Sequence, residues 1–271
     1  MSLNHHRIGS GEPLVLLHGI GSRWEIWSPV LDRLAAERDV IAVDLPGFAH
    51  SPPPPPGTPA GVPSLTRLLV EFLDELELER PHVAGNSLGG WLALELAKLG
   101  RASSVVGLSP AGFHTPREGR YQQFVLASGA RLSRLIEPVA GSLLRYAAAR
   151  TVVLAAFVSK PWAMSASDAV LIVDGAARAT WFDETLAAIM QPEHFTGGER
   201  IDVPVTIAWG DRDRLLLPRQ ARRVTRSIPG ARVLTLPGCG HLPTLDDAEL
   251  VARVLLDGTS ARTPRPAPAP A

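Results

Sequence analysis

The chain has 271 residues, 45% of them hydrophobic, which is typical of one large α/β domain or of one core with an inserted subdomain. Its 27 Lys and Arg residues balance 27 Asp and Glu residues, so no basic excess indicates a nucleic-acid partner. The single cysteine, Cys239, excludes an intrachain disulfide. No signal-peptide pattern and no membrane-spanning apolar run occurs, so we expect a cytoplasmic protein.

Apolar runs of strand length alternate with helical patterns over the first 110 residues. We predict strands at residues 13–17, 39–44, 81–85 and 103–109. The helical spacing of apolar residues predicts helices at about 27–34, from an N-cap at Ser64 to about 76, and at 88–99. Repeated strand–helix units form parallel sheets covered on both faces. We therefore predict an α/β fold with a mostly parallel central sheet and helices on both faces.

The second half of the chain interrupts this alternation and then resumes it. Residues 111–200 are rich in Ala, Leu, Val and Arg at helical spacing and contain no clear strand. Strands at 203–210 and 231–238 follow, with helices near 217–228 and 246–256. We divide the chain into a first core part (1–110), a helical cap insertion (111–200), a second core part (201–257) and a disordered Pro/Ala-rich tail (258–271).

The segment "GNSLGG" lies between a predicted strand and a predicted helix. Gly85 and Gly89 stand two residues before and two after Ser87, where a sharp strand-to-helix turn leaves no room for Cβ atoms. Such a turn exposes the serine and aims the N-terminal amides of the next helix at a reacting oxygen. The alternative is a glycine-rich turn with no chemical role. The position after a strand and before a helix favours Ser87 as a nucleophile.

A serine hydroxyl needs a base, and the base needs an orienting carboxylate. His241 lies in "GCGHLP", a loop at the carboxyl end of the last predicted strand, where open α/β sheets place their sites. Asp211 and Asp213, at the end of the preceding strand, both qualify as the carboxylate. We interpret Asp44 as a turn cap. Six other histidines are interpreted as solvated or structural: His5, His6, His50, His82, His114 and His194.

The oxyanion of an acyl-transfer reaction needs two N–H donors. Leu88 follows the nucleophile and supplies one donor. The loop "HGIGS" (18–22) supplies the second, because its glycines allow close approach of the backbone. We assign this donor to Ile20, with Gly21 as the alternative. His18 is expected to order this loop by hydrogen bonding.

Taken together, six segments resemble the α/β-hydrolase family: "LLHGIG", "DLPGFAHS", "GNSLGGWLALELA", "LSPAG", "WGDRDRLLLP" and "GCGHLPTLDD". They spread over nearly all of residues 13–256. The resemblance implies serine-type hydrolysis and a triad acid three residues after the glycine of the "WG" strand end. That position is Asp213, which leaves Asp211 as a turn residue.

The sequence departs from patterns of the family and its branches at three positions. Ala49 stands where the family's "D-x-P-G-x-G-x-S" turn has its second glycine. The nucleophile is a serine and not an aspartate, which disfavours the haloalkane dehalogenase and epoxide hydrolase branches. "GNSLGG" also resembles the meta-cleavage carbon–carbon hydrolases, but these carry a Trp after the catalytic His, where this chain has Leu242.

These observations predict a serine hydrolase that cleaves a small to medium apolar carboxylic ester through an acyl-enzyme, with no cofactor and no metal. The alternatives are a carbon–carbon bond hydrolase of the meta-cleavage type and a non-catalytic hydrolase-like ligand-binding protein. Aromatic residues of the cap either line an acyl pocket or form the cap's own core: Phe124, Tyr146, Phe157, Trp162, Trp181 and Phe182. A further alternative makes residues 146–158 a surface helix that meets lipid, with Arg145 and Arg150 near the headgroups.

Overall fold

The computed structural model describes residues 2–190 and 194–260, and its central element is a seven-stranded sheet. Its strands are β1 His5–Gly9, β2 Pro13–Leu17, β3 Asp39–Val43, β4 His82–Asn86, β5 Ser104–Leu108, β6 Val205–Gly210 and β7 Arg232–Leu236. The strand order is β1-β3-β2-β4-β5-β6-β7. All neighbours pair in parallel except β1 and β3, which are antiparallel. The predicted α/β fold with a mostly parallel sheet is therefore confirmed.

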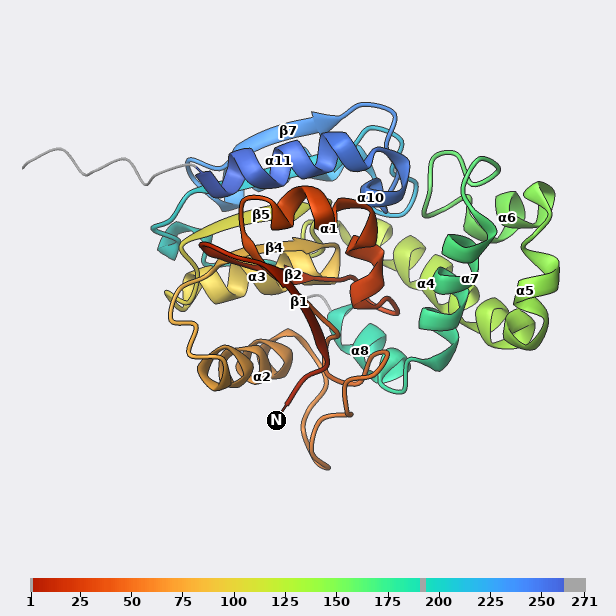
Figure 1. Cartoon of the computed structure of the whole chain (residues 1–271), viewed down its shortest axis with the longest axis horizontal. Coiled ribbons are helices and arrows are strands. Elements are labelled where there is room, and N and C mark those ends of the chain that lie inside the picture. Colours follow the sequence, from red (N-terminus) through yellow and green to blue (C-terminus); the bar gives the residue numbers. More distant parts are fainter. Residues whose placement is uncertain (1, 191–193, 261–271) are drawn as a thin grey trace, which may run out of the picture.

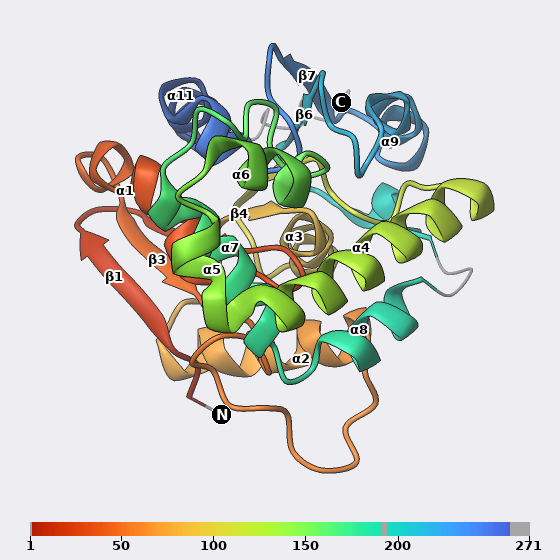
Figure 2. The ribbon, with the colours of Figure 1, turned by 90° about the vertical axis from the view of Figure 1, so that its right-hand side faces the viewer.

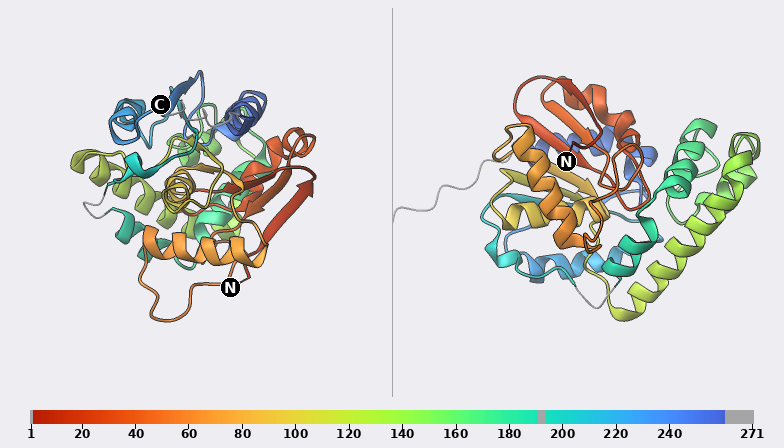
Figure 3. Two further views of the ribbon diagram at one scale, coloured as in Figure 1. Left: turned by 90° about the vertical axis from the view of Figure 1, so that its left-hand side faces the viewer. Right: turned by 90° about the horizontal axis from the view of Figure 1, so that it is seen from below.

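Helices cover both faces of this sheet because successive strand residues point to opposite sides. On β2, Leu14 and Leu16 pack in one apolar cluster with α1 (Ser28–Ala35) and α11 (Ala248–Ser260). Val15 and Leu17 pack in the other cluster, with α2 (Val62–Glu75), α3 (Leu88–Lys98) and α9 (Ala221–Ser227). Figure 3 shows α2 (orange) and α11 (blue) on opposite sides of the sheet. Shorter segments connect these elements: η1 Trp24–Trp27, η4 Pro218–Gln220 and α10 Pro243–Asp246.

The insertion between β5 and β6 is helical and lies together on one side of the molecule (Figures 1 and 2). Its helices are α4 Pro116–Ile136, α5 Ala140–Leu143, α6 Ala147–Leu154, α7 Ala166–Arg178 and α8 Phe182–Ile189, with η2 Glu137–Val139 and η3 Gly198–Arg200. Thr115 and Glu118 form a capping box that starts α4, and Ser165 caps α7. A small apolar cluster of its own holds α5, α6 and α7 together.

Three expectations differ from the structure. Helix α2 begins at Val62 and not after Ser64, because Pro63 is preorganised for the first helical turn. Helix α11 reaches Ser260, so residues 258–260 belong to it rather than to a tail. At Gly258 a Cβ would lie 2.5 Å from Val106 Cγ2, so glycine allows this close packing. The rest of the predicted tail, 261–271, lies outside the described residues.

The third difference concerns the lipid-contact alternative for residues 146–158. Arg150 is buried and does not reach a surface, because its guanidinium donates to the carbonyls of Leu144, Arg145, Pro161 and Trp162. Within the described residues, no helix combines the length and the apolar character needed to cross a bilayer.

Candidate active site

Ser87 stands alone between β4 and α3 in a strained backbone conformation. Its φ is 55° and its ψ is −117°, a region that non-glycine residues rarely adopt. The Ser87 N–H donates to Leu108 O (3.0 Å), and the Ser87 carbonyl accepts from Trp91 N (3.1 Å) and Ala111 N (3.0 Å). Bonds to β5, to α3 and to the segment after β5 therefore stabilise the strained turn.

Glycine is required on both sides of this turn. A Cβ at Gly85 would lie 2.2 Å from the carbonyl carbon and oxygen of Gly89, and a Cβ at Gly89 would lie 2.1 Å from Leu17 O. Both contacts are with backbone, of α3 at Gly89 and of β2 at Leu17, which cannot move away without disrupting these elements. A Cβ at Gly19 would lie 3.2 Å from Ser87 Cβ, so the loop after β2 packs directly against the serine.

His241 and Asp213 form a buried pair beside Ser87. His241 Nδ1 lies 2.8 Å from Asp213 Oδ2, and both side chains are at least 96% buried. Asp213 Oδ1 accepts from Leu215 N (2.9 Å) and Leu216 N (2.8 Å). A carboxylate only accepts, so Nδ1 carries the proton of the bond to Asp213, and in the neutral ring Nε2 is then an acceptor.

The other candidate carboxylate, Asp211, lies in an exposed turn. Asp211 Oδ1 accepts from Gly238 N (2.7 Å), and Asp211 N donates to Leu236 O (3.2 Å). It therefore joins the ends of β6 and β7, and among the described residues it makes no contact with His241 that would orient the ring. The structure brings Asp213 and His241 together and leaves Asp211 apart.

The loop between β2 and η1, residues 18–23, lies between Ser87 and the cap. Leu45 N donates to His18 Nε2 (2.9 Å), so His18 Nδ1 carries a proton and donates to Gly19 O (2.7 Å). Burial lowers the pKa of His18 and keeps this ring neutral. His18 thus fixes the loop through hydrogen bonds to both of its ring nitrogens.

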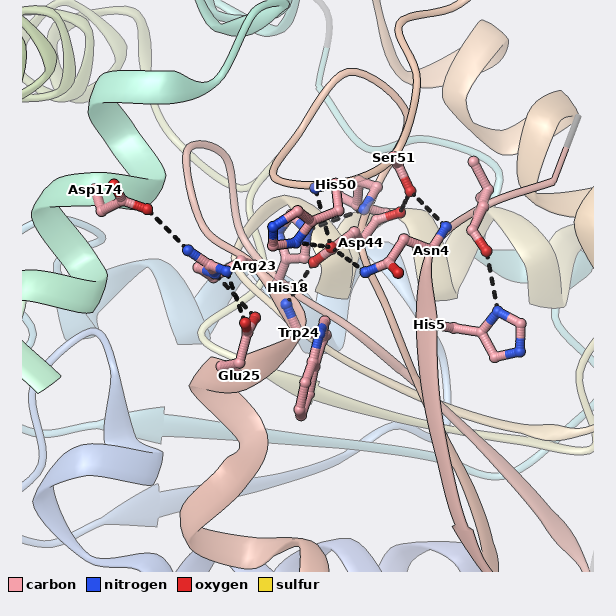
Figure 4. Close-up of polar contacts among 12 residues, drawn as sticks. Asn4, His5, His18, Arg23, Trp24, Glu25, Asp44, His50, Ser51 and Asp174 are labelled. Atoms are coloured by element: carbon pink, nitrogen blue, oxygen red, sulfur yellow. Dashed lines mark hydrogen bonds and ion pairs between the residues drawn. The ribbon is translucent and has the colours of Figure 1, made fainter.

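Asp44 holds Trp24, the residue that follows this loop (Figure 4). Its Oδ1 accepts from Trp24 N (2.7 Å), and its Oδ2 accepts from Asn4 Nδ2 (2.7 Å) and His50 N (3.2 Å). Ser51 Oγ donates to Asp44 O (2.6 Å). Asp44 is therefore the centre of a junction of four segments and does not line the cavity beside Ser87.

The two residues expected to donate to an oxyanion lie on either side of Ser87. Leu88 is the first residue of α3, and Ile20 lines the same cavity as Ser87 and His241. Neither the Leu88 N–H nor the Ile20 N–H donates to an acceptor within residues 2–190 and 194–260. The Gly21 N–H is equally without an acceptor in that part of the chain, so Gly21 stays an alternative donor.

Two residues that the sequence analysis did not single out hold the His241 loop. Asn86 Nδ2 donates to His241 O (3.0 Å) and to Leu108 O (3.0 Å), which ties the turn of Ser87 to this loop. Asp246 Oδ2 accepts from Gly240 N (2.7 Å), while its Oδ1 accepts from Ser159 Oγ (2.8 Å). Asn86 was visible only as the variable residue of the elbow motif, and Asp246 only as a helix start.

A cavity of about 60 Å³ lies between the sheet and the cap, with room for a few water-sized groups. Ser87 and His241 lie on its wall, and most of the rest is apolar. Of the six cap aromatics, only Phe157 and Phe182 line it; Phe124, Tyr146 and Trp162 are exposed, and Trp181 packs on Gly47. The other lining residues are Gly19, Ile20, Gly21, Ser22, Asn86, Leu126, Gly129, Ala130, Ser133, Val153, Leu154, Ile172, Ala176, Leu215 and Leu242.

The remaining titratable groups near this region have other roles. Burial raises the pKa of the Cys239 thiol to about 12, with Asp246 as the next cause, so this thiol stays protonated and is a poor nucleophile. Burial, and next the neighbouring His194, lower the pKa of His114 to about 4. Neither Cys239 nor His114 lines the cavity of Ser87.

A model of the alpha/beta hydrolase family matches residues 14–254. Epoxide hydrolase EphH of Mycobacterium tuberculosis is 33% identical over 179 residues, which is 64% of this chain and 83% of that protein. A 2-hydroxy-6-oxo-2,4-heptadienoate hydrolase of Pseudomonas putida is 42% identical over 97 residues, 35% of this chain and 35% of that protein.

A third relative is longer than this chain. The dihydrolipoyllysine-residue acetyltransferase component of the acetoin cleaving system of Pseudomonas putida is 29% identical over 255 residues, which is 91% of this chain and 63% of that protein. Among solved structures, an esterase of Thermogutta terrifontis superimposes with a TM-score of 0.74 at 19% identity and covers 95% of this chain and 93% of its own. This last similarity concerns the fold.

Proposed function

Since the chain belongs to the alpha/beta hydrolase family, we propose that it is a serine hydrolase of a small to medium apolar carboxylic ester. The observation that supports this most is the placement of Ser87, in a strained turn, on the same cavity wall as His241, whose Nδ1 is held by Asp213. The cavity is small and largely apolar, which fits a short acyl chain.

The proposed reaction proceeds through an acyl-enzyme. Ser87 Oγ attacks the ester carbonyl carbon while His241 Nε2 takes the hydroxyl proton, and Asp213 stabilises the imidazolium. The oxyanion accepts hydrogen bonds from the N–H groups of Leu88 and Ile20. His241 then protonates the leaving alcohol. Water attacks the acyl-enzyme, His241 takes its proton and returns it to Ser87 Oγ, and the carboxylic acid leaves.

The side chain at position 87 favours an ester over an epoxide as substrate. The proposed proton transfer needs an O–H on the nucleophile and an imidazole whose Nε2 can accept a proton. Ser87 supplies the first, and His241, which is bound to Asp213 through Nδ1, supplies the second. The similarity to EphH extends over 179 residues but does not determine the bond that is cleaved.

A second candidate function is the cleavage of a carbon–carbon bond. The 42% identity to a 2-hydroxy-6-oxo-2,4-heptadienoate hydrolase over 97 residues favours it. The same serine, histidine and aspartate would carry that reaction on a ketone in place of an ester. The two functions are therefore separated by substrate, not by the identity of the triad.

The experiment is hydrolysis of p-nitrophenyl esters of increasing acyl length by the wild type and by Ser87→Ala. We expect a rate with an optimum at short chains and a loss of about 10³-fold or more in kcat for Ser87→Ala, with an unchanged melting temperature. A vinylogous diketone acid is assayed in parallel. Cleavage of that acid with every ester untouched would establish the second function instead.

A further inference from the structure

The cavity beside Ser87 contains almost no charge. Among the described residues that line it, His241 is the only titratable side chain, and it is paired with Asp213. The amide nitrogen of Asn86 is also engaged, since both of its bonds go to backbone carbonyls. Apart from Ser87 and His241, the side-chain donors left on the wall are the hydroxyls of Ser22 and Ser133.

Ser133 is the serine of the cap that lines the cavity beside Ser87. It lies on α4, is 6% exposed and makes no side-chain hydrogen bond to any described residue. Some helical hydroxyls bond the carbonyl four residues back, as Thr66 does to Val62 O (2.8 Å), whereas Thr185 on α8 has no side-chain partner among the described residues. Ser133 also lacks such a partner, but unlike Thr185 it lines the cavity, so its hydroxyl is available to a bound molecule.

The cations nearest these serines in the chain are neutralised by other groups. Arg23, next to Ser22, donates to Glu25 (2.7 Å) and to Asp174 (2.8 Å), as Figure 4 shows. Arg134, next to Ser133, pairs with Asp183 (3.0 Å). A carboxylate in the cavity would meet no free cation there, and burial of an unpaired carboxylate is strongly unfavourable.

We propose that the cavity selects an uncharged ester whose chain carries an acceptor oxygen, an ether or a carbonyl, that is bound by the hydroxyl of Ser133. This inference rests on the proposed serine hydrolysis. Ser133 is then a specificity residue in the cap, and the uncharged cavity disfavours substrates with a carboxylate on the chain. An all-carbon chain would bind over the hydroxyl of Ser133 and leave it unpaired, which lowers kcat/KM relative to an oxygen-bearing chain.

The test compares esters of equal length on the wild-type protein. The substrates are p-nitrophenyl hexanoate, two analogues in which an ether oxygen replaces carbon 4 or carbon 5 of the chain, and mono-p-nitrophenyl glutarate, with each rate divided by that of its alkaline hydrolysis. We expect one ether ester to exceed hexanoate about fivefold in kcat/KM. We expect the glutarate to fall at least about 100-fold below hexanoate.

Ser133→Ala tests the residue itself. Removal of the hydroxyl is expected to lower kcat/KM for the ether ester about fivefold and to raise it for hexanoate, so that the preference reverses. A structural role for Ser133 would move both rates in the same direction. Ser128→Ala, at an exposed position of the same helix, is the matched control and should change neither rate.

Three outcomes contradict the inference alone. These are a glutarate rate equal to that of hexanoate, no advantage for either ether ester, and equal losses on both esters in Ser133→Ala. A different outcome, no Ser87-dependent rate on any of the four esters, would overturn the proposed function and this inference with it.

Discussion

Asp44 and Asp213 are two buried carboxylates that follow strands of the same sheet, but they have different kinds of partner. Asp44 is fully buried, and both of its carboxylate oxygens accept hydrogen bonds from N–H donors of three other segments. In Asp213, one oxygen accepts from the N–H groups of Leu215 and Leu216, and the other bonds the His241 ring. Burial and hydrogen-bond satisfaction are equal in the two, so neither property distinguishes a structural carboxylate from a candidate catalytic one.

What distinguishes them is whether a titratable partner faces the cavity. The hydrogen-bond donors to Asp44 are the backbone N–H groups of Trp24 and His50 and the side-chain amide of Asn4. The His50 imidazole lies 3.7 Å from Asp44 Oδ2, but it is exposed and does not line the cavity. The partner of Asp213 is an imidazole that faces a cavity. A carboxylate beside a group that gains charge during a reaction can stabilise that charge, whereas Asp44 can stabilise only the folded chain.

The largest effect in this comparison is expected for Asp213→Asn. The amide oxygen can still accept from Leu215 and Leu216, so the fold is retained, but the amide NH₂ then faces His241 Nδ1. His241 must present an acceptor at Nδ1 and a proton at Nε2, which cannot take the proton of Ser87. We expect kcat on the best p-nitrophenyl ester to fall by about 10⁴-fold, measured beside the melting temperature.

The pH dependence of the residual rate tests the physical reason for this loss. Because the defect in Asp213→Asn is the wrong tautomer, its residual rate should rise with pH, as hydroxide replaces the missing base. A loss of similar size in Asp44→Asn, at unchanged stability, would show that burial and not the histidine partner determines the role of these carboxylates.

Asp44→Asn is expected to act on stability first. An amide at this position keeps one acceptor oxygen, but its NH₂ faces the N–H donors of Asn4 and His50 or of Trp24. We expect a loss of about 2–4 kcal/mol in the free energy of unfolding, measured in urea. Because Trp24 follows the loop of Ile20, kcat should also fall, by less than about tenfold. A stable variant with kcat reduced 100-fold or more would contradict the structural role of Asp44.

The sheet was predictable from the sequence because its signals are local. The run "PLVLL" coincides with β2, and the strands from β3 to β7 lie within two residues of their expected limits. Strand β1 was not predicted, because "HHRIG" has a single apolar residue, Ile8, and pairs at an edge of the sheet. Its stability comes from the ladder with β3, which a local pattern does not contain.

The site was predictable only in part, for the same reason. The turn of Ser87 and the loop of His241 are marked by local motifs, and the structure places Ser87 and His241 on one cavity. Asn86 and Asp246 are not marked by a local motif. The role of Asn86 depends on His241, 155 residues away, and the role of Asp246 depends on Ser159 in the cap. For the aromatic side chains of the cap, composition left open whether they line a pocket or form the cap's own core, and most of them do not line the cavity.

The smallest effect is expected for Asp211→Asn, two residues from Asp213 and of the same chemistry. Asp211 is exposed, and the oxygen that accepts from Gly238 N (2.7 Å) is retained in the amide. We expect kcat/KM within about twofold of the wild type and a change in unfolding free energy below about 0.5 kcal/mol. Both substitutions remove one negative charge, but only Asp213 bonds His241. The ratio of kcat between Asp211→Asn and Asp213→Asn therefore measures how much the bond to His241 contributes to the rate. A ratio near one would mean that the net charge of this turn, and not the contact with the imidazole, governs the rate.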